Sequence, residues 1–151
     1  MANLVCDYAK GRLMQLASLP LGTDNIIVVL LQTASLPSDT LIRRAPFLSS
    51  IFTAGAVEAN FTSYSRQVVL NTNVVVSVNT STDIVSFSIP SQVWNAAGGG
   101  TNNSLGALLV CYRPTSSSAD SAIVPLTKHD FVGSTTGGNL TASITTIATA
   151  A

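Results

Sequence analysis

The chain has 151 residues, which is enough for one domain with a buried core. Only 9% of its residues are charged, against roughly 25% in an average soluble protein, and seven basic residues balance seven acidic ones. The lack of a basic excess argues against a nucleic-acid partner. No apolar run reaches the roughly 18 residues that a membrane-spanning helix needs, so we expect no membrane contact either.

A surface so poor in charge lacks the repulsion that keeps free domains apart. One interpretation is that much of this surface is covered by copies of the same chain or by another protein. The alternative is a small secreted β-domain that tolerates a low charge. Composition favours neither interpretation over the other.

The N-terminal segment, residues 3–19, is predicted to form a helix. Asn3 is a suitable N-cap, and apolar residues recur at helical spacing along the segment. Gly11 weakens the interior of this helix by roughly 1 kcal/mol. Pro20 and Gly22 are expected to end it.

The same segment does not resemble a signal peptide. Asp7, Lys10 and Arg12 interrupt the place where its apolar core would lie. We therefore expect synthesis in a reducing cytoplasm, where Cys6 and Cys111 would be buried thiols. A disulfide between them stays open, because sequence gives no geometry.

Two short, dense apolar runs are predicted to be central strands. The first is 26–32, and the second is 105–112, which lies between a glycine-rich turn and Pro114. Neither run alternates apolar with polar residues. A strand covered on one side would alternate, so both strands are expected to be buried on both faces and to be neighbours.

The segment between these runs is predicted to hold a short helix over 40–44, capped by Ser38 or Asp39. Residues 47–63 show no clear periodicity and are predicted to be an extended, partly apolar connection. If this connection is exposed, it is a candidate contact surface.

Alternation of apolar and polar residues then predicts three short strands over 64–89, joined as an antiparallel meander. A further strand is expected at 122–126, where Pro125 places it at an edge or a bulge. A final strand is expected over 140–147.

These elements predict a mostly β fold. We expect one domain over 1–151, an antiparallel β-sandwich or squat barrel of about seven strands with an N-terminal α-helix packed on it. The helix occupies 3–19 and the β-rich body 26–149.

No group of residues carries an obvious chemistry. His129 and Asp130 are neighbours, but adjacent residues of a strand point to opposite faces and no nucleophile motif accompanies them. One histidine and two distant cysteines form no metal-ligand cluster. The glycines at 98–100 lack the strand and helix that surround a phosphate-binding loop. We therefore expect no catalytic, metal-binding or cofactor-binding residues and no small-molecule substrate.

The candidate site is an interface instead. Charge is so scarce that the arginines are expected to meet acidic groups on a partner rather than solvent alone. Aromatic residues of the 47–63 connection, and Trp94 in a segment expected to fold over the core edge, are expected to add apolar contacts. The candidate interface residues are Arg43, Arg44, Phe47, Phe52, Phe61, Arg66 and Trp94.

Three segments carry a resemblance to a known family. The run at 108–112 (LLVCY), the later 123–131 (IVPLTKHDF) and the upstream 89–94 (IPSQVW) resemble small structural proteins of tailed bacteriophages. The chain is similar to the head-associated, capsid-decorating proteins of phages that infect actinobacteria. The resemblance covers most of the chain, and its motifs are structural rather than catalytic.

The resemblance implies a virion protein that is made in the bacterial host and binds the outer surface of the phage head. Its partners would be the major capsid protein and itself, as a homotrimer. Alternatives remain open: a tail-tube, neck or fibre component, or a carbohydrate-binding module with Tyr64, Trp94 and Tyr112 as an aromatic platform.

Overall fold

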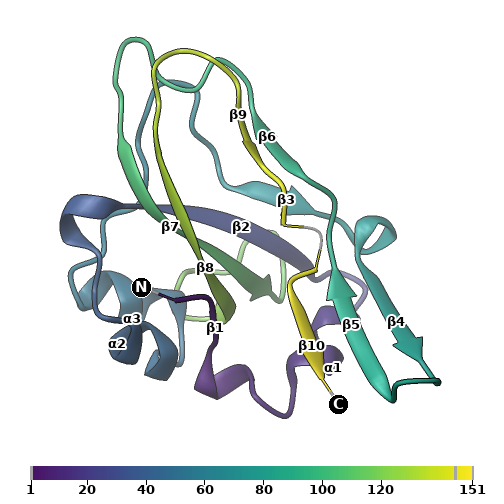
Figure 1. The fold of residues 1–151 in the computed structure, drawn as a ribbon. Helices are drawn as coiled ribbons and strands as arrows, with labels where there is room; N and C mark the ends of the chain where they lie inside the picture. Colours follow the sequence, from purple (N-terminus) through teal and green to yellow (C-terminus); the bar gives the residue numbers. More distant parts are fainter. Residues whose placement is uncertain (1, 145, 151) are drawn as a thin grey trace.

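The computed structural model describes residues 2–144 and 146–150, and these residues form a mostly β structure (Figure 1). Among them are ten strands in antiparallel sheets, three short α-helices and three 3₁₀ segments. The strands are β1 (Leu4–Val5), β2 (Asn25–Gln32), β3 (Gln67–Val69), β4 (Val75–Asn79), β5 (Ile84–Ser88), β6 (Gln92–Trp94), β7 (Ser104–Arg113), β8 (Val124–Ser134), β9 (Leu140–Ala142) and β10 (Ala148–Ala150). The helical segments are η1 (Asp7–Ala9), α1 (Leu13–Ala17), η2 (Thr33–Ser35), α2 (Asp39–Arg44), α3 (Leu48–Thr53) and η3 (Asn71–Asn73).

A five-stranded sheet in the order β1-β8-β7-β2-β3 forms the centre of the structure. Strands β2 and β7 lie side by side, with Val28 opposite Val110. Residues 25–31 of β2 and 105–112 of β7 are all buried. The prediction that these two runs are neighbouring strands buried on both faces is therefore confirmed.

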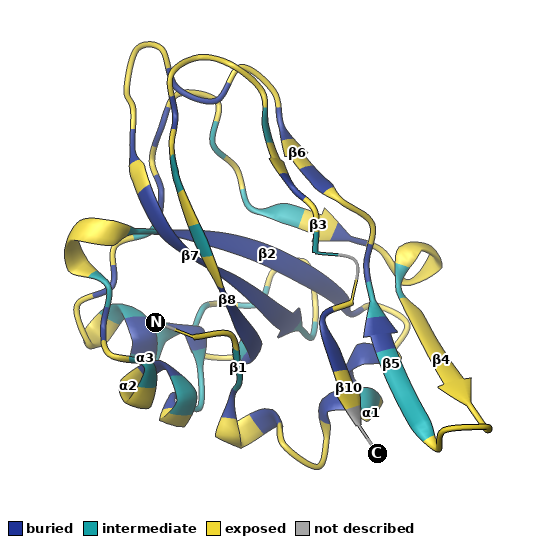
Figure 2. Ribbon diagram, in the orientation of Figure 1, coloured by how far each residue is buried: buried dark blue, intermediate teal, exposed yellow. Residues whose placement is uncertain are grey.

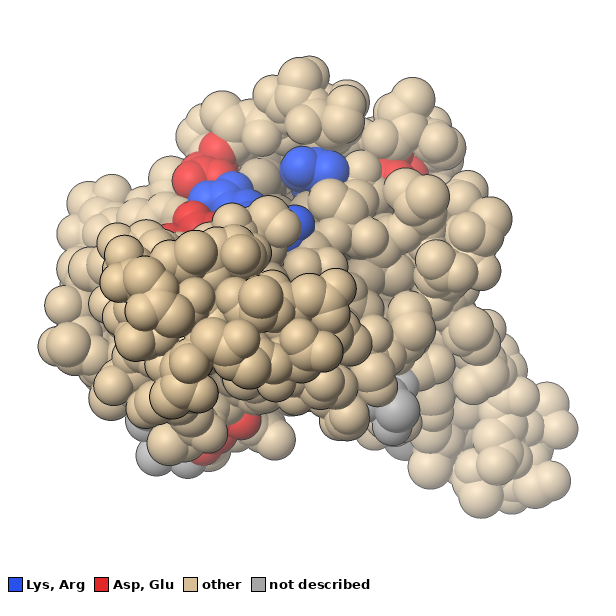
Figure 3. Space-filling model, turned by 90° about the horizontal axis from the view of Figure 1, so that it is seen from above, with Lys and Arg blue, Asp and Glu red and all other residues tan. Residues whose placement is uncertain are grey.

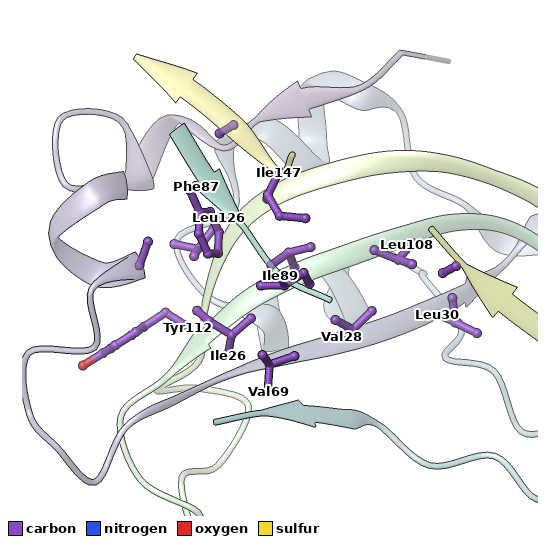
Figure 4. Packing of buried hydrophobic residues seen from close by; sticks show 14 of the residues in the cluster. Ile26, Val28, Leu30, Val69, Phe87, Ile89, Leu108, Tyr112, Leu126 and Ile147 are labelled. Atoms are coloured by element: carbon purple, nitrogen blue, oxygen red, sulfur yellow. The ribbon is translucent and has the colours of Figure 1, made fainter. Parts of the chain in front are cut away.

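One face of this sheet carries the larger apolar core. Alternate side chains of β2 point into this core, as Figure 4 shows. Phe87 of β5 and Ile89, which follows β5, pack into the same core. Strand β9, strand β10 and helix α1 also contribute buried residues to this cluster. The β2 residues on this face are Ile26, Val28 and Leu30.

The other face carries a second, smaller core. The intervening β2 residues pack here against the two helices α2 and α3. Helix α2 contributes Ile42, and α3 contributes Leu48 and Ile51, all essentially inaccessible to solvent. The β2 residues on this face are Ile27, Val29 and Leu31.

Two smaller sheets complete the structure on the side of the larger core. One has the order β10-β5-β4, and the other is the pair β6-β9. Strands β4 and β5 form a hairpin that projects from the body at the lower right of Figure 1. The prediction of a mostly β, antiparallel, sandwich-like domain is confirmed, with ten strands among the described residues rather than about seven.

The prediction of one helix over residues 3–19 is wrong. Leu4 and Val5 pair with β8 opposite Lys128 and Thr127, and the Asn3 side chain accepts a hydrogen bond from the Asp130 N–H at 2.7 Å. Gly11 adopts a φ of +78°, which a helix does not allow. Only 13–17 are α-helical, because pairing with the sheet edge outcompetes the weak helical preference of the first residues.

The predicted three-stranded meander over 64–89 is also wrong in its first strand. Strand β3 pairs with β2 in the central sheet, with Val68 opposite Ile27. Only β4 and β5 form a hairpin, and their third partner is β10. Alternation identified strands here but could not identify their partners.

The connection between β2 and β3 is partly helical. Helix α2 is confirmed but begins at Asp39, one residue before the predicted 40–44, and its cap is Ser38, whose Oγ accepts the Leu41 N–H at 3.4 Å. The prediction of an extended 47–63 segment is wrong over Leu48–Thr53, which is α3. Leu48 and Ile51 are three residues apart and both face the smaller core, so burial of one helical face explains the helix.

The C-terminal strands differ in length from the predictions. Strand β8 begins at Val124 and continues to Ser134, and the register shifts where Pro125 lies opposite Cys111. Pro125 therefore occupies a bulge, as predicted. The single strand predicted over 140–147 is divided into β9 and the later β10, and residue 145 lies outside the described residues.

Both cysteines are buried and free. The Cys6 Sγ lies 3.8 Å from the Ile42 carbonyl oxygen. Burial, with a smaller contribution from the charge of Asp7, raises the pKa of the Cys6 thiol to about 12, and burial also raises that of Cys111. The prediction of buried thiols is confirmed, and neither thiol is activated.

Candidate interaction surface

Most of the few charged side chains form ion pairs with other residues of the same chain. Of the seven acidic and seven basic residues, nine form ion pairs with one another. These nine are Asp7, Lys10, Asp39, Arg43, Glu58, Arg66, Asp120, Lys128 and Asp130. In the space-filling view of Figure 3, the charged atoms are few and sit among broad uncharged areas.

Arg66 is the centre of one charged network. Its guanidinium donates to both Glu58 oxygens at 2.8 and 2.7 Å, and to both Asp120 oxygens at 2.6 and 3.1 Å. The Tyr64 hydroxyl donates to Glu58 Oε1 at 2.8 Å and accepts the Leu30 N–H at 3.2 Å. The network thus ties the start of β3 to the edge of β2 and to the serine-rich loop before β8.

This network leaves Arg66 little capacity for a partner. The hydrogen bonds to Glu58 and then to Asp120 raise the pKa of the guanidinium, so it stays charged. Burial, and then the negative charge of Glu58, raise the pKa of Tyr64, so this phenol stays neutral. The guanidinium carbon also lies 5.9 Å from the centre of the Phe52 ring.

Lys128 is the centre of a second network. Its side chain is fully buried, and its Nζ donates to Asp130, to Asp39 Oδ1 at 3.1 Å and to the Ala2 carbonyl at 3.1 Å. The Ala2 N–H donates to Asp39 Oδ2 at 2.9 Å. The network joins the N-terminal strand, the first turn of α2 and β8, which is a structural role.

His129 does not cooperate with Asp130. Its Nε2 lies 2.9 Å from the Thr127 Oγ1, whereas Asp130 bonds to Lys128. Burial, and then the positive charge of Lys128, lower the pKa of the imidazole. No hydrogen bond joins His129 to Ser143 among the described residues, although both line one shallow hollow. The geometry of a base and a nucleophile is not assembled here.

Two further open hollows have volumes of about 420 and 410 Å³, similar to the 440 Å³ of the hollow beside His129. Within residues 2–144 and 146–150, no three His, Cys, Asp or Glu side chains lie close enough to hold a metal ion. Over the same residues, no helix has the length and apolar character to cross a membrane.

Two of the predicted interface residues belong to the interior. Phe61 is 2% exposed and packs edge-on against Tyr64, with 5.1 Å between ring centres. Trp94 is 1% exposed, and its indole N–H donates to the Ser65 carbonyl at 2.8 Å. Both rings fill the larger core, so neither offers a surface to a partner. The prediction that Phe61 and Trp94 lie at an interface is therefore wrong.

The other predicted residues reach the surface in two separate places. Arg43 and Arg44 end α2, and Arg43 Nε lies 3.6 Å from Asp7 Oδ2. Phe47 is half-buried, with its ring centre 6.0 Å from that of Tyr8. Phe52 and Arg66 lie beside each other. Their use as an interface stays a prediction.

The largest concentration of exposed apolar side chains lies elsewhere, between residues 67 and 82. Five of the eleven large apolar residues that are exposed in the described chain belong to this segment. They include three valines of β4, exposed by 53%, 36% and 66% respectively: Val75, Val76 and Val78. Figure 2 shows β4 as exposed over its whole length.

Strand β4 is also unpaired along one edge. Among the described residues it pairs only with β5, and β5 pairs on its other side with β10. Its outer row of N–H and C=O groups therefore faces solvent. We refer to the exposed strand 75–79 and its free edge as the β4 surface.

Sequence reasoning placed a strand here but missed the β4 surface. The alternation of Val74, Val76 and Val78 predicts a strand but does not show how far it is buried, and both faces of β4 are exposed. One signal was available: no charged residue occurs between Arg66 and Asp83. An exposed strand without charge is unusual, since charge normally protects such an edge.

A scan against protein-family models, a search of curated proteins and a search of solved structures each found no match to this chain.

Proposed function

We propose that this protein is a virion structural protein that decorates the outside of a bacteriophage head and acts by binding alone. It would bind the major capsid protein and other copies of itself, and would stabilise the shell by bridging neighbouring subunits. The homotrimer implied by the family resemblance is part of this proposal.

One observation carries the proposal: charged side chains are few, most of them are paired within the chain, and the valines of β4 are exposed. Nine of fourteen charged side chains are paired within the chain. Freely diffusing proteins keep apart through surface charge and keep exposed apolar patches small. A surface of this kind suits a subunit whose neighbours cover it, as in a symmetric assembly.

The resemblance of 89–94, 108–112 and 123–131 to capsid-decorating proteins supports the head as the site of binding. Within the fold, these segments belong to β6, β7 and β8 and the residues beside them. A shell of repeated subunits presents the same site many times. Weak contacts made by each copy then add through multivalency, without a large interface for any one copy.

The carbohydrate-binding alternative loses its aromatic platform. Trp94 and Tyr112 are 1% and 4% exposed, and the Tyr112 hydroxyl donates to Asp24 Oδ2 at 2.9 Å. Tyr64 is half-buried and bonded to Glu58. A sugar ring needs accessible aromatic faces to stack on, and these three do not supply them.

The proposal is tested on whole particles. Image reconstructions of phage heads with and without this protein are expected to differ by surface density, and adding the purified protein back is expected to restore it. Heads that look identical in both preparations would refute decoration. Labelled protein found along the tail or at the neck would assign the chain to that structure instead.

A further inference from the structure

The β4 surface lacks each of the usual protections of a free edge. Natural edge strands carry a lysine, a proline, a bulge or an inward-pointing charge, or are covered by another element. Residues 75–79 have the sequence VVSVN, with no charge and no proline. Their register with β5 runs from Val75 opposite Ser88 to Asn79 opposite Ile84 without a shift.

The two edges of the central sheet are better protected. Strand β1 has two residues, and the Lys128 network fixes the chain beside it. Strand β3 has three residues and follows directly on Arg66, whose guanidinium is held by Glu58 and Asp120. Strand β4 is longer than either and is exposed on both faces.

We propose that β4 pairs antiparallel with β4 of a second copy of this chain across a two-fold axis. The pairing joins the two three-stranded sheets into one continuous sheet of six strands. Its order is β10-β5-β4, followed by the same three strands of the partner in reverse order. The free N–H and C=O groups of each β4 edge would then bond to the identical edge of the other.

The sequence of β4 suits this partner in particular. A two-fold axis through Ser77 places Ser77 opposite its own copy, Val76 opposite Val78, and Val75 opposite Asn79. Two valine pairs then cover apolar surface on one face, and two hydroxyls meet on the other. Since the run 67–82 carries no charge, bringing two copies together costs no electrostatic repulsion.

The size of this contact predicts a weak association. Five residues from each copy make an interface at the low end of the known range, where complexes are transient. Pairing would be weak between free molecules and strong where copies are held side by side, through effective concentration. The inference deepens the proposed function, since a two-fold contact would connect neighbouring trimers on a shell.

The test exchanges charge at the centre of the proposed pair. Ser77 is exposed, so Ser77→Lys and Ser77→Glu are expected to leave the folded monomer unchanged. Each substitution alone would place like charges opposite each other and weaken self-association about fivefold. An equal mixture of the two variants is expected to associate at least as tightly as the unmodified chain, measured by analytical ultracentrifugation at low salt.

A cross-linking measurement fixes the register. In Ser77→Cys the two Cα atoms would lie about 4.5–5.5 Å apart across the axis, within the range that a disulfide bridges. Mild oxidation is therefore expected to yield covalent dimers. The matched control is Ser116→Cys, an exposed serine in the loop 115–121, which reports random collision and is expected to cross-link more slowly.

Two results would overturn the proposal. One is a mixture of the lysine and glutamate variants that associates no better than either variant alone. The other is equal cross-linking of Ser77→Cys and Ser116→Cys. Both outcomes concern the isolated protein, so they leave head decoration standing. Heads that look identical with and without the protein would refute decoration without affecting two-fold pairing in solution.

Discussion

Strands β2 and β4 are similar in composition and opposite in environment. Both are rich in β-branched residues, and neither carries a charge. In β2 every residue from Asn25 to Leu31 is buried, whereas in β4 all five residues are exposed (Figure 2). The apolar content of a strand therefore does not determine whether the strand is buried.

The difference comes from the neighbours of each strand. Strand β2 has β7 on one edge and β3 on the other, with an apolar core against each face. Strand β4 has β5 on one edge, and among the described residues none pairs with the other. We infer that the valines of β2 serve stability, and that those of β4 are available for binding.

The same substitution in the two strands should separate these roles most strongly. Val28→Asp buries an unpaired carboxylate in the larger core and is expected to lower the free energy of unfolding by more than about 4 kcal/mol, enough to prevent folding. Val78→Asp places the carboxylate in water and is expected to change stability by about 0.5 kcal/mol or less. Circular dichroism during thermal unfolding measures both.

A marked loss of stability in Val78→Asp would contradict the comparison. It would show that the β4 hairpin is packed in the free chain and not exposed. Val78→Thr keeps the shape of the side chain and adds one hydroxyl but no charge. An exposed site tolerates both changes, whereas a loss of stability in Val78→Asp alone would indicate a charge effect and a loss in both variants a packing defect.

The sequence predicts the centre of the fold well, for a physical reason. Runs such as 26–32 and 105–112 carry more apolar residues than one buried face requires, so both faces of each strand have to be covered. The N-terminal segment was mispredicted, because Val5 and Leu13 fit a helical stripe equally well whether or not a helix forms. Hydrogen bonding of Val5 to β8 decides the outcome, and that partner lies more than 100 residues away.

The candidate site was less predictable than the fold. Phe61 was expected at an interface, because the aperiodic 47–63 segment gives no sign of which side chains turn inward. Trp94 was expected there too, because the segment that carries it was expected to fold over the core edge. The exposure of the β4 valines was not predicted, because alternation indicates a strand and not its place in a sheet. The interval without charge from 67 to 82 was readable beforehand, and it is the part of the sequence that points to this surface.

Charged residues extend the comparison, because the central sheet depends on ion pairs and the β4 surface has none. Arg66→Met removes the guanidinium between Glu58 and Asp120, and leaves two carboxylates facing each other. All three side chains are about a quarter to a third exposed, so solvent weakens the effect. We expect a loss of about 1–2 kcal/mol in the free energy of unfolding, measured by urea denaturation.

Arg44→Met is the matched control. Arg44 is exposed at the end of α2, and its replacement is expected to change stability by about 0.5 kcal/mol or less. Equal losses in the two variants would mean that the Arg66 network contributes nothing beyond general surface charge. Raising the salt concentration should reduce the difference between the variants only modestly, because the Arg66 pairs are partly buried.

The smallest expected effect is a pH dependence confined to the central sheet. Burial lowers the pKa of His129 below its ordinary value of 6.5, so the unfolded chain takes up a proton more readily than the folded chain. Stability is then constant above pH 6.5 with respect to this group and falls as the pH decreases below it. Urea denaturation between pH 7.5 and 5 is expected to show this slope, and His129→Gln, which can still bond to Thr127, is expected to remove it. Strand β4 of the unmodified chain has no titratable side chain, so the self-association of the unmodified chain should stay constant over the same range. A slope that persists in His129→Gln would assign the pH dependence to another group, and an association that follows the pH would place a titrating residue at the β4 surface.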